Sequence, residues 1–173
     1  MSERRSAIIV AFGLPARIEA IRRRHVPVAT LGVPPHVTIL SPFVAADDLD
    51  DGVRATLADI AAGHRAFDVR FGRCASFPDA LYLAPDPAQP FKAIIAAVCR
   101  AFPAYPPYGE PTFRPEDAEP HLTIAIGERR AFDALAEAVT SSLPVEDRAQ
   151  VLTVIVEGTD ERWRTRWRIG LRP

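Results

Sequence analysis

Hydrophobic and polar positions along the chain follow two periods, one typical of strands and one typical of helices. Strand-like runs, apolar or alternating, cover residues 7–12, 36–40, 67–71, 81–84, 121–126, 150–156 and 163–169. Apolar stripes of helical period cover residues 14–24, 49–61, 90–98 and 132–143. Asp47 or Asp48 is expected to cap the second helix and Gly63 to end it. The pattern predicts a mixed fold of helices and strands.

Arginines concentrate in the first helix and in the last strand. The apolar face of the first helix consists of Leu14, Ile18 and Ile21. Its charged residues, which lie elsewhere on the helix, are Arg17, Glu19 and Arg22–Arg24. In the last strand, alternation predicts that four arginines share one face: Arg162, Arg164, Arg166 and Arg168. The other face is then shared by Trp163, Thr165, Trp167 and Ile169. Such a face suits a nucleic-acid backbone, but the near-neutral chain favours a solvated edge strand whose arginines pair with surface acids.

The order of elements repeats along the chain. Each half reads strand, helix, strand, helix, strand, which predicts one domain with a first repeat over 1–75 and a second over 78–173. The segment 103–120 interrupts the second repeat and contains six prolines. Two interpretations stay open for this segment, a stiff polyproline-like connector and a loop that covers the substrate.

Composition excludes several classes of protein. With 48% hydrophobic and 25% charged residues, the chain is expected to be globular, and its net charge of −1 argues against a strongly basic nucleic-acid binder. Cys74 and Cys99 lack the spacing of a metal or disulfide motif, so we expect reduced thiols. The apolar run 7–12 is short for a signal peptide, and no stretch approaches the ~20 apolar residues of a membrane span. We expect a cytoplasmic protein without a membrane partner.

A five-residue motif occurs twice, once in each predicted half. Residues 35–39 read Pro-His-Val-Thr-Ile and residues 120–124 read Pro-His-Leu-Thr-Ile. Because alternate side chains of a strand point to the same face, each motif presents one histidine and one threonine together. One such motif by itself is more often structural, but its repetition favours catalysis by four residues: His36, Thr38, His121 and Thr123.

These residue types suit displacement at phosphorus. A neutral histidine takes a proton from the attacking oxygen, and a protonated one gives a proton to the leaving oxygen on the opposite side. Threonine hydroxyls can donate hydrogen bonds to the non-bridging oxygens. The two motifs are locally alike, so the sequence leaves open which histidine is the acid and which the base. No metal or other cofactor is expected, because the sequence lacks the spacing of a three- or four-ligand metal site.

The stretches PHVTILSPF and PHLTIAIG, with the strand AIIVAF before the first, resemble the 2H phosphoesterase superfamily, and within it the 2'-5' RNA ligase-like proteins. The resemblance implies an α+β fold with two pseudo-twofold lobes, in which two antiparallel sheets flank a central cleft and the helices lie outside. It implies cyclic phosphodiesterase activity on 2',3'-cyclic phosphates, with ATP-independent ligation in some relatives. It also implies that His36 and His121 are the acid–base pair and that Thr38 and Thr123 hold the phosphate.

One position departs from that resemblance. Better-known RNA ligase-like members often have an arginine five residues after the second histidine, where this chain has Ile126. The departure weakens the ligase assignment more than the phosphoesterase assignment.

Further candidates for binding the substrate are Arg114, as a phosphate ligand, and Tyr82 and Phe12, as base-stacking residues, with surface exposure or core packing as the alternatives. The expected partner is an RNA end or a cyclic or 2'-5'-linked nucleotide, bound by a monomer. The competing hypothesis is a binding module of the same fold that does not turn its ligand over.

Overall fold

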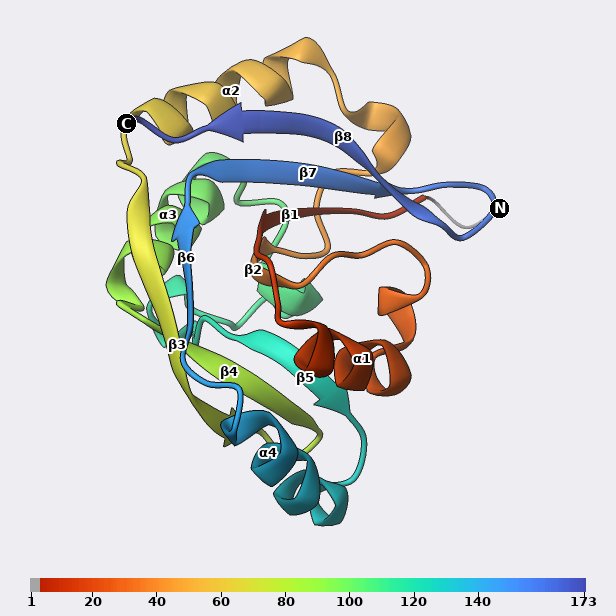
Figure 1. The fold of residues 1–173 in the computed structure, drawn as a ribbon. Coiled ribbons are helices and arrows are strands. Elements are labelled where there is room, and N and C mark those ends of the chain that lie inside the picture. The colour runs from red at the N-terminus through yellow and green to blue at the C-terminus, as the bar shows by residue number, and fades with distance from the viewer. Residues whose placement is uncertain (1–3) are drawn as a thin grey trace.

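The computed structural model describes residues 4–173, which form four α-helices and eight β-strands (Figure 1). The strands are β1 (Ser6–Ala11), β2 (His36–Leu40), β3 (Phe67–Ser76), β4 (Ala80–Asp86), β5 (Leu122–Ile126), β6 (Val145–Ala149), β7 (Val151–Glu157) and β8 (Trp163–Gly170). The helices are α1 (Ala16–His25), α2 (Asp51–Ala62), α3 (Gln89–Ala101) and α4 (Phe132–Thr140). None of the helices described is long and apolar enough to cross a membrane.

The eight strands form one antiparallel sheet in the order β6-β3-β4-β5-β2-β1-β7-β8. The α+β class and the antiparallel pairing are as expected, but the expected pair of separate sheets is not what forms. The two halves of the sheet join where β2 meets β5, through the single residue pair Val37–Leu122. This junction gives each central strand a partner on both sides, so neither presents an unpaired edge there.

Each half of the sheet takes strands from both halves of the chain. The strand β3 follows α2 in the sequence, yet it pairs with β4 and β6 on the far side of the junction. Conversely, β7 belongs to the second half of the chain but pairs with β1 of the first half. The spatial halves are therefore β6-β3-β4-β5 and β2-β1-β7-β8. They differ from the expected sequence repeats, because an antiparallel edge accepts any strand of suitable pattern regardless of its place in the chain.

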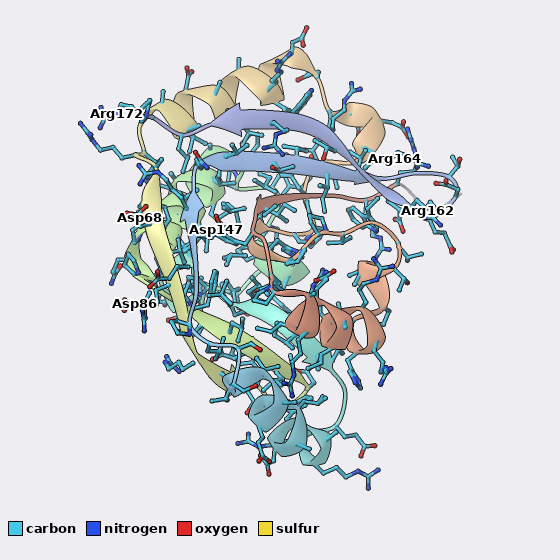
Figure 2. The ribbon with its side chains drawn as sticks, in the orientation of Figure 1. Asp68, Asp86, Asp147, Arg162, Arg164 and Arg172 are labelled. Atoms are coloured by element: carbon cyan, nitrogen blue, oxygen red, sulfur yellow. The ribbon has the colours of Figure 1, made fainter. Side chains whose placement is uncertain are left out.

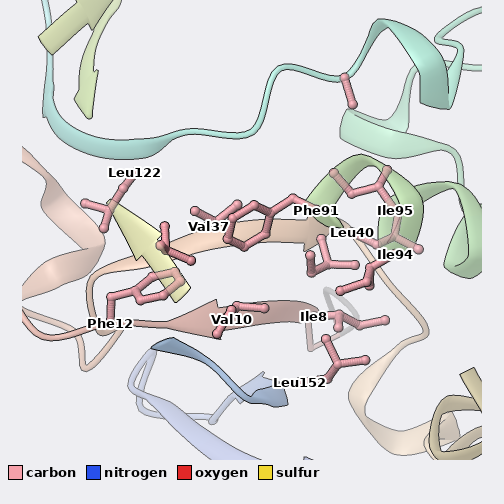
Figure 3. Close-up of a cluster of buried hydrophobic side chains, with 14 of the residues drawn as sticks. Ile8, Val10, Phe12, Val37, Leu40, Phe91, Ile94, Ile95, Leu122 and Leu152 are labelled. Atoms are coloured by element: carbon pink, nitrogen blue, oxygen red, sulfur yellow. The ribbon is translucent and has the colours of Figure 1, made fainter. Parts of the chain in front are cut away.

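The hydrophobic core lies under the junction, where strand residues meet α3 (Figure 3). Val37 and Leu122 are completely buried, and so are Phe91 and Ile94 of α3. Burying side chains of this size contributes about 1.5–3 kcal/mol each. The helix α3 packs on β2, and α1 packs on β5, so each motif strand is covered by the helix of the other repeat.

Two local elements differ from the sequence expectation. The cap of α2 is Asp50, whose carboxylate accepts a hydrogen bond from the Val53 backbone N–H at 2.9 Å, while Asp47 and Asp48 belong to a preceding 3₁₀ turn. The strand β6 was not expected, because its sequence VEDRA is polar. It forms at the sheet edge, where its charged side chains face solvent and pair across to β3.

A bulge divides the last strand into two parts. Val154 pairs with Trp167 and Ile155 with Thr165, so Arg166 has no partner. A bulge residue shifts the alternation by one position and exchanges the faces of the strand. Trp163 consequently packs beside Ile155 on one face, while Trp167 packs on the main core on the other. The expectation that four arginines share one face of this strand is therefore wrong.

Candidate active site

The junction of the sheet brings the two histidine–threonine motifs together. Residues directly opposite each other in an antiparallel pair point to the same face. Val37 and Leu122 oppose each other and point into the core. The residues on either side of them consequently point to the other face, where all four are half-buried: His36, Thr38, His121 and Thr123. Two histidines that lie 85 positions apart in the chain thus become neighbours.

The register also sets the spacing of the four side chains. Continuing the antiparallel register from the junction places His36 opposite Thr123 and Thr38 opposite His121. The two histidines are then diagonal neighbours, and residues in this relation lie roughly 7–8 Å apart, with their Cβ atoms somewhat closer. That spacing leaves room for a phosphoryl group between the two imidazoles. Neither threonine hydroxyl forms a hydrogen bond with another described residue, so both are available to a ligand.

A bulge follows each motif at the same position. Thr38 and Leu40 pair with consecutive residues of β1, which leaves Ile39 unpaired, and Ile124 is left unpaired against β4 in the same way. Bulges bend a strand and increase its twist. The two motifs thus share a bulge at the same position, in keeping with their matching sequence.

The backbone holds both imidazole rings in the same manner. The distance from His36 Nδ1 to the Pro34 carbonyl oxygen is 2.7 Å, and that from His121 Nδ1 to the Glu119 carbonyl oxygen is 2.6 Å. A carbonyl oxygen only accepts hydrogen bonds, so Nδ1 carries the proton in each ring. In a neutral ring the lone pair is therefore on Nε2. Each histidine has its proton-transfer atom directed away from its own loop.

A buried arginine supports the first histidine but has no counterpart at the second. Arg22 of α1 is only 2% exposed, and its Nη2 donates to the carbonyl oxygens of Val33 at 2.9 Å and Pro34 at 3.0 Å. The Pro34 oxygen thus accepts from both Arg22 and His36. The Glu19 carboxylate, 3.4 Å from Arg22 Nη1, partly balances the buried charge.

The charges around the two histidines differ in sign. Burial lowers the pKa of His36 to about 4. The hydrogen bond to Pro34 acts to raise this pKa, whereas the positive charges of Arg22 and His121 lower it further. Burial also lowers the pKa of His121, but here the carbonyl and the carboxylate of Glu119 both act to raise it. The first histidine faces a cation and the second faces an anion.

Aromatic side chains border the second histidine. The Tyr82 ring stacks on Phe77 with ring centroids 4.5 Å apart, and both rings contact His121, at 5.4 Å and 5.0 Å. A pocket of about 420 Å³ opens beside them. Its lining combines aromatic and acidic side chains: Phe77, Asp79, Ala80, Tyr108, Phe113, Asp117, Glu119 and His121. We call it the aromatic pocket.

The proline-rich segment 103–120 forms one wall of the aromatic pocket. The backbone N–H of Tyr108 donates to the Ser41 carbonyl at the end of β2, which ties the segment to the first motif strand. Tyr108 has a φ of 57° and is 52% exposed, and its ring lies edge-on to Phe113. The segment therefore lies beside the site, and its role as a loop that covers the substrate, rather than as a stiff polyproline-like connector, stays a prediction.

The other sequence candidates fall in different places. Tyr82 is buried, and its ring lies 5.4 Å from that of His121 and is absent from the lining of the aromatic pocket, so base stacking by this residue stays a prediction. The ring of Phe12 packs against Phe71 and Phe91, so of the two alternatives for this residue the structure shows core packing. Arg114 is exposed on the loop and is absent from the lining of the aromatic pocket.

Sequence reasoning missed four residues of this region, Arg22, Phe77, Tyr108 and Phe113. A signal existed for Arg22, because it follows Ile18 by four positions and so shares the buried face of α1. No comparable signal marked the three aromatic residues, which come from a turn and an irregular loop.

The acidic residues near the site do not form a metal centre. Across residues 4–173 there is no group of three or more His, Cys, Asp or Glu side chains placed to hold a metal ion. The groups that the site offers for chemistry are the two histidines, the two threonines and their partners.

Comparisons with known proteins concern the family and the fold. The family model described as the 2'-5' RNA ligase superfamily matches residues 12–161. No curated protein matches by sequence. Among solved structures, Escherichia coli LigT complexed with 3'-AMP matches with a TM-score of 0.55 at 14% identity, over 99% of this chain and 100% of that one.

Two further solved structures share the fold. A protein described as a phosphoesterase matches with a TM-score of 0.56 at 14% identity, over 99% of this chain and 100% of that chain. The protein TT0787 of Thermus thermophilus matches with a TM-score of 0.53 at 13% identity, over 97% of this chain and 98% of that one. The family model spans most of the chain and shows that it belongs to the 2'-5' RNA ligase superfamily, within the 2H phosphoesterases, and the solved structures share its fold.

Proposed function

We propose that the protein is a phosphoesterase that hydrolyses 2',3'-cyclic phosphate or 2'-5' phosphodiester bonds of RNA ends or nucleotides by acid–base catalysis with two histidines. The observation that carries the proposal is the Val37–Leu122 pair, which makes His36 and His121 diagonal neighbours on one face of the sheet. The fold is also that of Escherichia coli LigT, whose structures are complexed with 3'-AMP and with phosphate.

The arrangement suits an in-line displacement on a 2',3'-cyclic phosphate. Water attacks phosphorus from one side, and the bond to the ribose O3' breaks on the other. The base histidine takes the water proton on its Nε2, and the acid histidine gives its Nε2 proton to O3'. The products are a 2'-phosphomonoester and a free 3'-hydroxyl, and the two histidines have exchanged protonation states. Thr38 and Thr123 donate to the non-bridging oxygens as negative charge accumulates there.

The charges around the two histidines support different roles for them. Arg22 opposes a positive charge on His36, so this ring is neutral and ready to accept a proton. The Glu119 carboxylate favours a positive charge on His121, which suits the acid. We therefore assign His36 as the base and His121 as the acid in the direction of hydrolysis.

The aromatic pocket suits the nucleoside that carries the leaving oxygen. Tyr108 and Phe113 offer faces and edges for a nucleobase, and stacking on an aromatic ring contributes about 1–3 kcal/mol per base. Asp79 and Asp117 offer acceptors for exocyclic amino groups of a base. This placement brings the sugar next to His121, the residue that protonates O3'.

The reverse displacement, attack of a hydroxyl on the cyclic phosphate, would ligate two ends. Ile126, where better-known ligase-like members have an arginine, is 52% exposed and offers no group to bind a second phosphate. We therefore place hydrolysis ahead of ligation for this chain.

The test is a phosphorus NMR time course with a 2',3'-cyclic nucleotide and with a short RNA that carries the same end. We expect the wild type to produce a 2'-phosphomonoester. His36→Ala and His121→Ala should each lower the rate by about 10²–10⁴, the usual contribution of a positioned proton transfer. His25→Ala, which removes a histidine at the end of α1, is the matched control and should react like the wild type.

Two outcomes would count against the proposal. Tight binding of both compounds without turnover would favour the competing hypothesis, a binding module of the same fold. Turnover that survives both histidine substitutions would place the chemistry elsewhere in the protein.

A further inference from the structure

The aromatic pocket, in which the proposed function places the leaving nucleoside, has a negatively charged lining. Three exposed residues contribute carboxylates to it, Asp79, Asp117 and Glu119. Within residues 4–173, none of these carboxylates forms an ion pair. The part of the lining that the structure describes contains no lysine or arginine, so the only side chain there that gains a positive charge is His121. An anionic part of a ligand therefore finds no counter-ion in this pocket beyond His121 itself.

The nearby arginine of β3 does not cancel this negative charge. Arg73 is exposed and lies outside the lining of the pocket. Burial raises the pKa of Tyr82, the Glu119 carboxylate raises it further, and the Arg73 guanidinium lowers it by less. Because the Tyr82 ring lies against that of His121, this comparison applies close to the reacting groups. The carboxylate acts more strongly there than the guanidinium.

The arginines of the last strand are too distant to balance the carboxylates. Arg162 and Arg164 lie beside the β7–β8 hairpin, at the other end of the sheet from β3 and β4 (Figure 2). Four strand spacings of roughly 4.8 Å each separate β8 from β5 along the sheet. This separation exceeds the Debye length of about 8 Å at physiological ionic strength, so the exposed charges are largely screened from each other.

An apolar side chain lies beside the carboxylates. Ile126 pairs directly with Ala80, which lines the pocket, so the two side chains point to the same face of the sheet. Ile126 is 52% exposed. Its side chain offers a phosphate neither a positive charge nor a hydrogen-bond donor. This side of the pocket therefore suits an uncharged group.

The geometry of ribose connects this lining to the choice of substrate. In the proposed pose the base occupies the aromatic pocket and O3' lies next to His121, which is itself part of the lining. O5' belongs to the same ribose, so a phosphate on it stays within roughly one Debye length, about 8 Å, of the lining carboxylates. They repel that phosphate, whereas a free 5'-hydroxyl is uncharged and can donate a hydrogen bond to one of them.

We propose that the carboxylates of the aromatic pocket select a leaving nucleoside with a free 5'-hydroxyl. The preferred substrate is then a 2',3'-cyclic mononucleotide, and a phosphate on O5', including the phosphodiester that continues an RNA chain, is disfavoured. This inference rests on the proposed function and decides between the nucleotide and the RNA end that the proposed function leaves open.

The test compares kcat/KM for a 2',3'-cyclic mononucleotide with that for the same compound phosphorylated on O5'. Each exposed charge pair changes an equilibrium by roughly 1.4- to 5-fold, so three carboxylates should give the 5'-hydroxyl compound an advantage of roughly five- to fifty-fold. The advantage should decrease as salt is raised from about 0.01 M to about 1 M, because the Debye length shortens from about 30 Å to about 3 Å.

Variants of the lining test whether the carboxylates cause the preference. Asp79→Asn and Asp117→Asn keep the shape of the side chain and remove its charge, so each should lower the ratio of the two kcat/KM values. Asp117→Lys should lower this ratio further. Any change in base binding acts on both compounds and cancels in the ratio. The matched control is Asp59→Asn, an exposed position on α2, which packs on β8, and it should leave the ratio unchanged.

A binding measurement makes the inference independent of turnover. By calorimetry, a nucleoside 2'-phosphate should bind more tightly than the 2',5'-bisphosphate of the same nucleoside, although it carries less negative charge. Equal or faster hydrolysis of the 5'-phosphorylated compound, or a ratio that Asp117→Lys changes no more than Asp59→Asn does, would overturn the inference and leave the proposed function intact. If neither compound is hydrolysed, the proposed function fails, and the two affinities alone decide whether the pocket rejects a 5'-phosphate.

Discussion

The buried arginine of α1 offers the sharpest test of how the first motif is held. In Arg22→Met, an unbranched apolar side chain replaces the guanidinium and fills much of its space. The carbonyl oxygens of Val33 and Pro34 each lose a charged donor, and the Glu19 carboxylate is left without its cation. The variant therefore separates the role of the charge and hydrogen bonds from simple packing.

The expected loss of stability follows from these contacts. Each hydrogen bond to a charged group contributes about 1.5–3 kcal/mol, and breaking one side of a buried ion pair costs about 3–5 kcal/mol. These terms overlap, so we expect the free energy of unfolding to fall by about 3–5 kcal/mol in total. For a chain of this length the Tm should decrease by roughly 6–20 °C.

Urea unfolding at pH 7 measures this change, with Arg23→Met as the matched control. Arg23 is the next residue of α1 and is exposed, so its substitution should alter stability by no more than about 0.5 kcal/mol. Adding Glu19→Gln to Arg22→Met should recover part of the loss, because it removes the unpaired carboxylate. If Arg22→Met and Arg23→Met unfold within about 1 kcal/mol of each other, the reasoning about the buried cation is refuted.

Two further predictions concern stability. Because the pKa of His36 is lowered to about 4 in the fold, the unfolded chain binds more protons between about pH 6.5 and pH 4. Acidification across this window should therefore lower the free energy of unfolding of the wild type by about 1–3 kcal/mol more than that of His36→Gln, as measured by urea unfolding. If both proteins lose the same free energy of unfolding, the buried environment of His36 is contradicted. Asp50→Ala should cost about 0.5–2 kcal/mol in thermal unfolding through loss of the α2 cap, whereas a similar loss in the mid-helix control Asp59→Ala would argue against capping.

Local sequence predicted most of the helices and strands correctly. The structure confirms the strands expected over 7–12 and 36–40 and the helices α2 and α3. Their hydrophobic periods depend only on neighbours in the chain. The repeated motif singled out His36 and His121, and the alternation of a strand paired each with its threonine. These inferences need only the preference of each residue and the period of its element.

The features that the sequence did not predict share a physical cause. The polar strand β6 forms because β3 offers it an edge, and the bulge at Arg166 reverses the faces of β8. For Phe12 the sequence leaves base stacking and core packing open, and contacts with Phe71 and with Phe91 of α3 bury its ring. In each case a partner remote in sequence decides the outcome, and local periodicity carries no information about that partner.

Local patterns along the chain are enough to identify two matching histidine–threonine motifs on strands. That the two motifs meet follows from the fold alone, because it depends on one pairing between strands 85 residues apart. The fold also decides how they differ, since the loop before His36 packs on a buried arginine and that before His121 carries a carboxylate. Two closely similar motifs therefore have different charges around them, because electrostatic interactions depend on distance in space and not on separation along the chain.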